Sequence, residues 1–349
     1  MLPPSKTATK AVSETATETE IEAAGAPLQR LREELNGVLF GQEALIDGVL
    51  TGLLARGHLL LEGLPGLGKT ELVKGLAKAL GMTTKRIQFT PDLLPGDITG
   101  SPILQENAET QRREFVFQPG PLFANLVLAD EINRASPKTQ SALLEAMQER
   151  RVTVMGESHP LPAPFFVIAT QNPIELEGTY PLPEAQLDRF LFKLDVPRAG
   201  AAVLEKIVTG REMGVEPEVS PVLSREQLTE LTALARRIYL PPVVANYIAR
   251  LVEATHPGCS PCTEKVKFGA SPRAALGLAV AARARALLAG RLNASFEDVV
   301  AVAPAVLGHR VILDYSARLV GETSAGVVER LLKEIPFQQL DMPGLLAPA

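Results

Sequence analysis

This sequence has neither the cysteines for a disulfide framework nor the apolar runs of a membrane protein. Only two cysteines occur among its 349 residues, which is typical of a protein from a reducing compartment. Its longest apolar stretches are interrupted by arginine before the roughly 18 residues that a bilayer span requires. The N-terminal segment also lacks the apolar core of a signal peptide. These absences predict a cytoplasmic protein without membrane insertion.

Aromatic side chains and excess positive charge are also scarce. Aromatic residues make up 5% of the chain and its formal net charge is −5. Both features argue against a nucleic-acid motor, which needs stacking platforms and a basic surface. The hydrophobic content of 46% is ample for sizeable cores, so a wholly disordered chain is excluded. The length predicts two domains.

The composition changes along the chain and predicts where these domains begin and end. Residues 1–26 are rich in Thr, Ala, Glu and Pro and contain no aromatic residue, which predicts a disordered tail. Residues 27–197 alternate helical and strand patterns and predict an α/β domain. Residues 198–220 are predicted as a linker carrying the first lid-side helix. Residues 221–335 are predicted as a smaller all-α lid domain and residues 336–349 as a C-terminal tail.

Short, nearly continuous apolar runs in the first domain predict a parallel sheet buried on both faces. The expected strands are 58–63, 86–90, 125–130 and 165–170. Helical periodicity dominates the second domain. The expected helices are 199–213, 224–237, 241–254, 271–289, 295–306 and 324–334.

The segment GLPGLGKT fits the pattern G-x-x-x-x-G-K-S/T between a predicted strand and a predicted helix, as a phosphate-binding loop requires. Its residues are Gly63, Leu64, Pro65, Gly66, Leu67, Gly68, Lys69 and Thr70. In such a loop, backbone N–H groups and the helix N-terminus surround the phosphates. Lys69 would reach the β and γ phosphates of ATP, and the Thr70 hydroxyl would bind Mg²⁺. An incidental glycine-rich turn is the alternative.

Polar residues follow two further predicted strands. NLVLADE ends in Asp130 and Glu131, and FFVIATQNP leads to Asn172. Strand ends at one edge of a parallel sheet converge on the ligand crevice. We expect Asp130 to hold Mg²⁺, Glu131 to activate water for attack on the γ phosphate and Asn172 to orient that water. Ordinary turn chemistry explains Asn172 equally well when it is taken alone.

Five motifs occur in an order that resembles the MoxR family of AAA+ ATPases over about residues 27–335. They are GLPGLGKT, LVLADEINRA, IATQNP, PLPEAQLDRF and GASPRAA. The resemblance implies a P-loop NTPase parallel-sheet domain followed by an all-α lid. It implies that Asn172 is sensor 1, Arg189 the arginine finger and Arg273 sensor 2, and that Gln42 lies at the entrance to the adenine pocket. Taken alone, Arg189 beside Asp188 is equally a surface ion pair.

The same resemblance implies how the protein works. Arginine fingers of AAA+ rings come from the neighbouring subunit, which implies a homo-oligomeric ring, expected as a hexamer. Which subunit Arg273 serves stays open. The resemblance also implies a chaperone-like remodelling role on a protein client, with a von Willebrand factor A domain protein as partner. Two alternatives are the motor subunit of a metal chelatase and a nucleotide-gated binding module.

Two segments interrupt the α/β pattern. Residues 93–120 resemble the helix 2 insert of this branch of AAA+ proteins. Residues 150–165 are predicted as a hairpin that turns near Met155 to Glu157. In a ring, both would project toward a central channel and contact a client; the alternative is that they are two decorated surface loops.

The remaining candidates for site chemistry are histidines and cysteines. HPGCSPC combines His256, Cys259 and Cys262, half of a zinc-site pattern without a second pair nearby, so two loop thiols are the favoured interpretation. The other histidines, His58, His159 and His309, lack a Ser or Cys partner in a recognisable motif and are expected to be structural or exposed.

Overall fold

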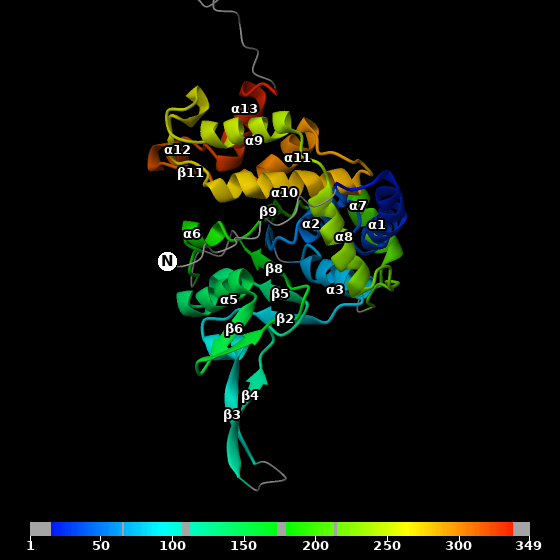
Figure 1. Cartoon of the computed structure of the whole chain (residues 1–349). Coiled ribbons are helices and arrows are strands. Elements are labelled where there is room, and N and C mark those ends of the chain that lie inside the picture. Colours follow the sequence, from blue (N-terminus) through cyan, green and yellow to red (C-terminus); the bar gives the residue numbers. More distant parts are fainter. Residues whose placement is uncertain (1–14, 65, 107–111, 173–178, 213–214, 338–349) are drawn as a thin grey trace, which may run out of the picture.

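A computed structural model describes residues 15–64, 66–106, 112–172, 179–212 and 215–337. An α/β domain carries a helical lid above it, and one long hairpin projects from the opposite end (Figure 1). The predicted fold class, a parallel α/β sheet domain with a helical lid, is confirmed. The terminal stretches 1–14 and 338–349 of the predicted tails lie outside the described residues.

The α/β domain contains a parallel sheet with the strand order β2-β5-β8-β1-β9. Its strands are β1 (Leu59–Glu62), β2 (Thr84–Gln88), β5 (Leu126–Asp130), β8 (Phe166–Gln171) and β9 (Phe192–Asp195). Four of them coincide with the predicted strands. The fifth, β9, was not predicted because its sequence FKLD is short and carries two charges. It forms an edge of the sheet, where Lys193 pairs with Glu62 of β1 at 2.7 Å.

Each face of the sheet is covered by its own helices, and successive strand residues serve alternate faces. Leu59, Leu61 and Ile168 pack toward α1 (Glu18–Val38), α2 (Glu43–Leu54) and α3 (Lys69–Ala79). The intervening Leu60 and Val167 pack in a second cluster with the opposite helices. These are α4 (Pro95–Thr99), η1 (Ile132–Arg134), α5 (Pro137–Glu149) and α6 (Glu184–Leu187). Ser136 caps α5, and Pro137 occupies its first turn, as the sequence predicts.

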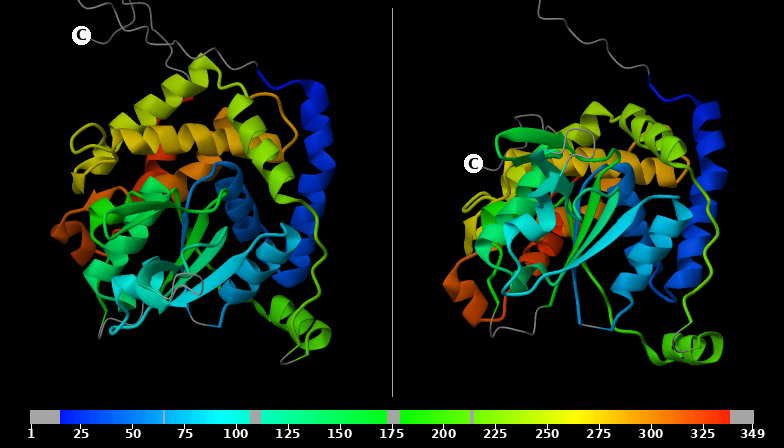
Figure 2. Two further views of the ribbon diagram at one scale, coloured as in Figure 1. Left: turned by 60° about the horizontal axis from the view of Figure 1, so that its bottom comes forward. Right: turned by 90° about the horizontal axis from the view of Figure 1, so that it is seen from below.

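The first helix corrects the predicted N-terminal boundary. It begins at Glu18, with Thr17 as its cap, and runs through Pro27, so the prediction of a disordered tail is wrong for residues 18–26. Ile21 and Ala24 are buried, because α1 contacts α2, α3 and the lid helix α10. Figure 2 shows α1 running beside both domains. Tertiary burial here outweighs a composition that taken alone indicates disorder.

Two hairpins lie in the two segments that were predicted to interrupt the α/β pattern, although only the second segment was predicted as a hairpin. The first, β3 (Gly100–Glu106) with β4 (Arg113–Pro119), forms the projection in Figure 1. The second, β6 (Arg151–Val154) with β7 (Glu157–Pro160), turns at Met155 and Gly156, both at positive φ. The Phe117 and His159 rings stack at 4.0 Å and join the two hairpins.

The lid consists mainly of the predicted helices. These are α8 (Arg225–Arg237), α9 (Pro242–Ala254), α10 (Pro272–Leu288), α11 (Phe296–Leu307) and α13 (Ser324–Glu334), while α7 (Ala201–Gly210) lies in the predicted linker segment, apart from them (Figure 2). The structure adds α12 (Tyr315–Leu319), η2 (Pro261–Thr263) and a small antiparallel sheet of β10 (Val266–Phe268) with β11 (Ile312–Leu313). No helix in the described part of the chain has the length and apolar character to cross a membrane.

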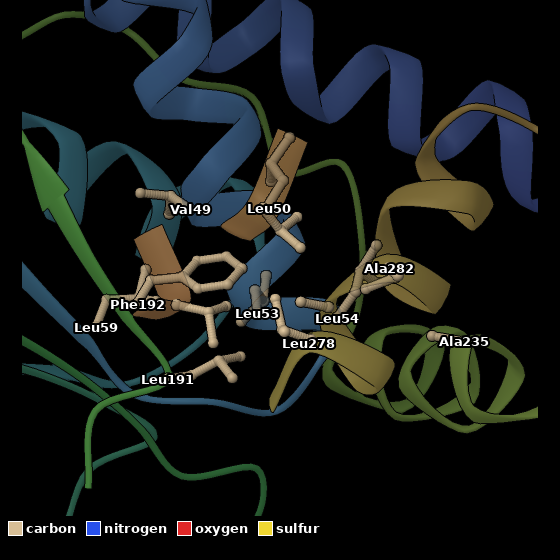
Figure 3. Close-up of a cluster of buried hydrophobic side chains, with 14 of the residues drawn as sticks. Val49, Leu50, Leu53, Leu54, Leu59, Leu191, Phe192, Ala235, Leu278 and Ala282 are labelled. Carbon is tan, nitrogen blue, oxygen red and sulfur yellow. The ribbon is translucent and has the colours of Figure 1, made fainter. Parts of the chain in front are cut away.

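The two domains share one hydrophobic core. Figure 3 shows Leu54 of α2, Leu191 and Phe192 beside β9, and Leu278 of α10 in the same cluster. All four are at most 8% exposed. The lid is therefore packed against the α/β domain through the chain that follows Arg189.

Candidate active site

The glycine-rich loop joins β1 to α3, as the sequence predicts. Gly66 and Gly68 both have a φ of +79°, a left-handed conformation that glycine adopts without a steric cost. A Cβ on Gly68 would also lie 2.5 Å from Leu39 Cδ1. Leu64 and Leu67 are half-buried, while the predicted Pro65 lies outside the described residues.

The residues expected to act on phosphate line one cavity of about 260 Å³, here called the phosphate cavity. Its lining comprises Gly66, Gly68, Lys69, Thr70, Glu71, Arg86, Gln88, Asp130, Glu131 and Asn172. Lys69 Nζ donates to the carbonyl oxygen of Gly63 in the same loop at 2.8 Å. Burial lowers the pKa of Lys69, and the charges of Asp130 and Glu131 oppose that shift.

Asp130 ends β5 and is 8% exposed. Its Oδ1 accepts a hydrogen bond from Thr170 Oγ1 at 2.6 Å, and its Oδ2 accepts from Arg86 Nη2 at 2.6 Å and Nε at 3.1 Å. The Arg86 guanidinium therefore balances the negative charge of the carboxylate that is expected to bind a cation. This carboxylate and the Thr70 hydroxyl are oxygen donors of the kind that Mg²⁺ prefers, so the residues fit that ion.

Glu131 follows with a φ of 57°, an uncommon conformation for a residue with a side chain, found most often at functional sites. Its N–H donates to Thr170 Oγ1 at 2.9 Å. Its Oε2 accepts from Gln88 Nε2 at 2.7 Å and from Arg134 Nη1 at 3.0 Å. The carboxylate is thus held between Gln88 of β2 and Arg134 of η1.

A second, more apolar cavity of about 540 Å³ adjoins the loop and shares Gly66, Gly68 and Glu71 with the phosphate cavity. Gln42 lines it and is 7% exposed. Gln42 Nε2 donates to Pro197 O at 3.5 Å, whereas Oε1 is buried without a hydrogen-bond partner among the described residues. A buried acceptor without a partner is costly, and an exocyclic amino group such as that of adenine would satisfy it.

The two candidate arginines lie elsewhere. Arg189 and Arg273 line a separate cavity of about 250 Å³ with His58, Met147, Gln148 and Asp188, here called the arginine cavity. Arg189 Nη1 donates to Leu144 O at 2.8 Å. Arg273 Nη1 lies 3.8 Å from Asp188 Oδ2, and its side chain is 59% exposed. The structure therefore brings Arg189 and Arg273 together, in a cavity different from that of Lys69.

The remaining histidines and cysteines have structural contacts. Burial lowers the pKa of His58 to about 4 and that of His309 to about 3. His58 Nδ1 accepts from Val167 N at 3.0 Å, so its Nε2 donates to Met147 O at 3.1 Å. Cys262 Sγ donates to Glu334 Oε2 at 2.8 Å, and Cys259 is exposed. Within the described ranges, His, Cys, Asp and Glu side chains form no group of three suited to a metal ion.

Three residues of the phosphate cavity region were missed by the sequence analysis. Arg86 and Gln88 lie on β2, and Thr170 lies on β8. These strands flank β5 on its two sides, so their polar side chains meet Asp130 and Glu131. Their only signal in the sequence is a polar residue near the end of a strand. That signal points to the site only when the strand order shows that β2 and β8 flank β5.

Family models match both domains. The model described as "ATPase family associated with various cellular activities (AAA)" matches residues 58–192, and the one described as "AAA lid domain" matches residues 261–331. These ranges include Lys69, Asp130, Glu131, Asn172 and Arg189 in the first model and Arg273 in the second.

Similar proteins match nearly the whole chain. Chaperone MoxR1 of Mycobacterium tuberculosis is 45% identical over 90% of this chain and 83% of its own length. Protein MoxR of Methylorubrum extorquens is 32% identical over 82% of this chain and 87% of its own length. A crystal structure of a Cytophaga hutchinsonii protein assigned as an ATPase superimposes with a TM-score of 0.84 and 38% identity. That match covers 92% of this chain and 98% of the other.

Proposed function

The chain belongs to the MoxR family of AAA ATPases, and from that premise we propose that its subunits form a hexameric ring whose ATP sites are completed between neighbours. As an AAA ATPase it binds and hydrolyses ATP. The proposal concerns which residues carry out the reaction, the ring itself and the protein on which the ring acts.

One observation supports the proposal above all others. Lys69, Asp130 and Glu131 line the phosphate cavity, whereas Arg189 and Arg273 line the arginine cavity. The loop after β1 leads into α3 on one face of the sheet, while α6, directly before Arg189, lies with α5 on the other (Figure 1). A finger must reach the γ phosphate to act, and a neighbouring subunit provides that juxtaposition.

Within one subunit, each residue of the phosphate cavity has a role that its position favours. Backbone N–H groups of the loop and the start of α3 bind the phosphates, and Lys69 exchanges the Gly63 carbonyl for phosphate oxygens. Thr70 and Asp130 would hold Mg²⁺, which would offset the negative charge of the phosphates. Glu131 accepts a proton from the attacking water, and Asn172 orients that water. Gln42 contacts the adenine base.

The arginine cavity would supply the other half of the site. Arg189 stabilises the charge that develops on the transferred phosphoryl group. Arg273 lies 3.8 Å from Asp188, the residue before Arg189, and approaches the same nucleotide of the neighbouring subunit. In this proposal both arginines act in trans, and their shared cavity is the observation that favours this assignment for Arg273.

A protein client is the expected target of the ring. The relative from Mycobacterium tuberculosis is named a chaperone. The β3–β4 hairpin carries exposed Leu104 and Phe115, 54% and 67% exposed, opposite each other in the ladder. Such an apolar pair on a projecting element suits transient contact with a client chain. Following the family resemblance, we propose that a von Willebrand factor A domain protein is the partner.

Assembly tests the ring directly. The mass of the Glu131→Gln variant would be measured by light scattering with and without ATP and Mg²⁺, since this variant binds nucleotide without turning it over. A shift to the mass of six subunits is expected with ATP. A monomer under every condition would overturn the ring.

Mixed rings test the shared site. Arg189→Ala protein mixed with Lys69→Ala protein should recover hydrolysis, because some interfaces then combine an intact phosphate loop with an intact finger. Absence of recovery in mixtures whose mass shows ring formation would contradict action in trans.

A further inference from the structure

Arg310 of the lid is buried directly against the segment that carries Arg189. It follows α11 in sequence, is 7% exposed and makes five hydrogen bonds. Its Nε donates to Asp188 Oδ1 at 2.6 Å. Its Nη2 donates to Phe190 O at 2.7 Å and to Asp188 O at 3.2 Å, and its Nη1 donates to Leu191 O at 3.1 Å. These partners immediately surround Arg189 in the chain.

Other lid residues near Arg310 also contact the segment around Arg189. His309 Nε2 hydrogen-bonds with Phe190 O at 3.2 Å, and Ser271 Oγ donates to Asp188 Oδ2 at 3.3 Å. Leu191 lies close to Gly277 of α10, where an added Cβ would be 3.2 Å from Leu191 Cδ1. The chain on both sides of Arg189 is therefore fixed to the lid by charge, hydrogen bonds and packing.

Burying a guanidinium costs free energy, which the Asp188 carboxylate and the hydrogen bonds to carbonyl oxygens offset only while this geometry is kept. Burial lowers the pKa of Arg310, and the Asp188 carboxylate opposes that shift, while an arginine stays charged in either case. Its planar fork can satisfy one carboxylate and several carbonyls at once, which an ammonium group cannot do. Residues 188–191 are thereby held at several points rather than at one.

We propose that Arg310 is the positioning residue of the arginine finger: it fixes the backbone on both sides of Arg189 to the lid, so that the guanidinium of Arg189 is presented to the neighbouring subunit. This inference rests on the proposed action of Arg189 in trans. The lid of one subunit would thereby take part in hydrolysis at the ATP site of another subunit. Arg310 lies 121 positions from Arg189 in the sequence.

The test combines Arg310→Lys with mixed rings. Lysine keeps the charge and can pair with Asp188 but cannot hold the surrounding carbonyls. In rings of this variant alone, kcat should fall by roughly 10²-fold, as a displacement of about 1 Å causes at a reacting centre. The KM for ATP should not change, because each subunit keeps its own phosphate loop.

Mixing separates a misplaced finger from a damaged subunit. Arg310→Lys with Lys69→Ala should recover hydrolysis, since Lys69→Ala subunits supply intact fingers to intact ATP sites. Arg310→Lys with Arg189→Ala should not recover, since neither protein offers a well-placed finger. A merely structural defect in Arg310→Lys would prevent recovery in both mixtures.

The control is Arg291→Lys, which alters another ion pair of the lid, one in which the carboxylate is buried and the Arg291 side chain is 39% exposed. Arg291 Nη2 lies 2.5 Å from Asp298 Oδ1, and the Asp298 side chain is 2% exposed. This variant should hydrolyse ATP like the wild type. If Arg310→Lys fails to fold, Asp188→Asn replaces it, because it removes the charge from the same pair without changing its size, and the same pattern of recovery is expected.

The inference is overturned if the folded variant keeps the wild-type kcat, or if Lys69→Ala restores hydrolysis to Arg189→Ala rings but not to Arg310→Lys or Asp188→Asn rings. Failure of Lys69→Ala to restore hydrolysis even to Arg189→Ala overturns the action in trans itself, and the inference falls with it.

Discussion

The phosphate cavity and the arginine cavity differ in how their charged side chains are held. In the phosphate cavity, Lys69 contacts its own loop and Asp130 contacts Arg86, whose side chain is 53% exposed. In the arginine cavity, Asp188 pairs with Arg310, whose side chain is only 4% exposed. Contacts of the first kind can be exchanged for phosphate and a metal ion. Contacts of the second kind are not readily exchanged. Breaking a buried ion pair is strongly destabilising, because it leaves an uncompensated buried charge.

This difference suggests a division of labour. In the proposed mechanism, side chains of the phosphate cavity exchange partners during each turnover, whereas those of the arginine cavity keep their contacts and face the neighbouring subunit. Variants in the two cavities should therefore fail in different ways.

Removing the finger should have the largest effect. Arg189→Ala is expected to lower kcat by roughly 10³ to 10⁵-fold, since no other group replaces its charge at the phosphoryl oxygens. Binding of a fluorescent ATP analogue should be unchanged. Arg151→Ala is the matched control, because Arg151 is an exposed arginine 3.9 Å from Glu149. Equal loss in both variants would remove the distinction between the cavities.

Glu131→Gln should separate binding from chemistry within the phosphate cavity. The amide keeps the size of the side chain but cannot accept the proton of the attacking water, so kcat should fall by roughly 10² to 10⁴-fold. The dissociation constant for ATP should stay at the wild-type value. Glu226→Gln changes a carboxylate of the lid whose side chain is 69% exposed and should keep its activity. Weakened ATP binding in Glu131→Gln would argue against its role as the base.

Acid should loosen the arginine cavity through His58, which lines it. Burial lowers the pKa of His58 to about 4, below the ordinary value near 6.5. Between these two values the unfolded chain binds a proton that the folded chain does not, so stability is complete above about pH 6.5 and declines as the pH falls toward 4. The loss from His58 is about 3 kcal/mol over that range.

Urea unfolding at pH 7 and pH 5 measures this loss. The wild type should lose more unfolding free energy between the two pH values than His58→Gln, whatever the absolute stability of the variant. The same pH dependence in both proteins would show that His58 contributes nothing to it.

Arg86→Met should have the smallest effect and the opposite sign. Arg86 must leave Asp130 before a metal ion can bind there, so its removal should lower the half-saturating Mg²⁺ concentration for hydrolysis. An exposed pair contributes about 1 kcal/mol, which corresponds to roughly a fivefold change. Lys85→Met, an exposed neighbour on β2, should leave the Mg²⁺ dependence unchanged. A higher Mg²⁺ requirement in Arg86→Met would mean that Arg86 assists the ion.

The sequence was most informative where function depends on neighbouring residues. The loop from Gly63 to Thr70 and the strand ending in Asp130 could be identified because their chemistry is encoded within a few positions, and four strands followed from continuous apolar runs. Strand β9 was missed because an edge strand with Lys193 and Asp195 lacks such a run. The start of α1 was misjudged because Ile21 and Ala24 are buried by other helices, which composition does not record.

Contacts between residues far apart in the chain could not be predicted from the sequence. Arg86 lies 44 positions from Asp130, and Arg310 lies 122 positions from Asp188. Each arginine is unremarkable within its own segment, one on a strand and the other after a helix. Their partners depend on the strand order and on how the lid is seated, and no local pattern specifies either.

The β3–β4 hairpin also has a mechanical consequence. Its strands pair over seven residues each, a length of about 23 Å. At its base, Gly100 and Gly120 approach so closely that a Cβ on either would overlap the backbone of the other, and β3 contacts β6, which in turn contacts α5. The base of the hairpin is therefore connected to α5 through β6. A rotation of the hairpin about this base would move its far end. A tilt of about 10° at this base would displace the far ends of the two strands by about 4 Å, so a small rearrangement near the nucleotide would become a larger displacement on the element proposed to contact the client.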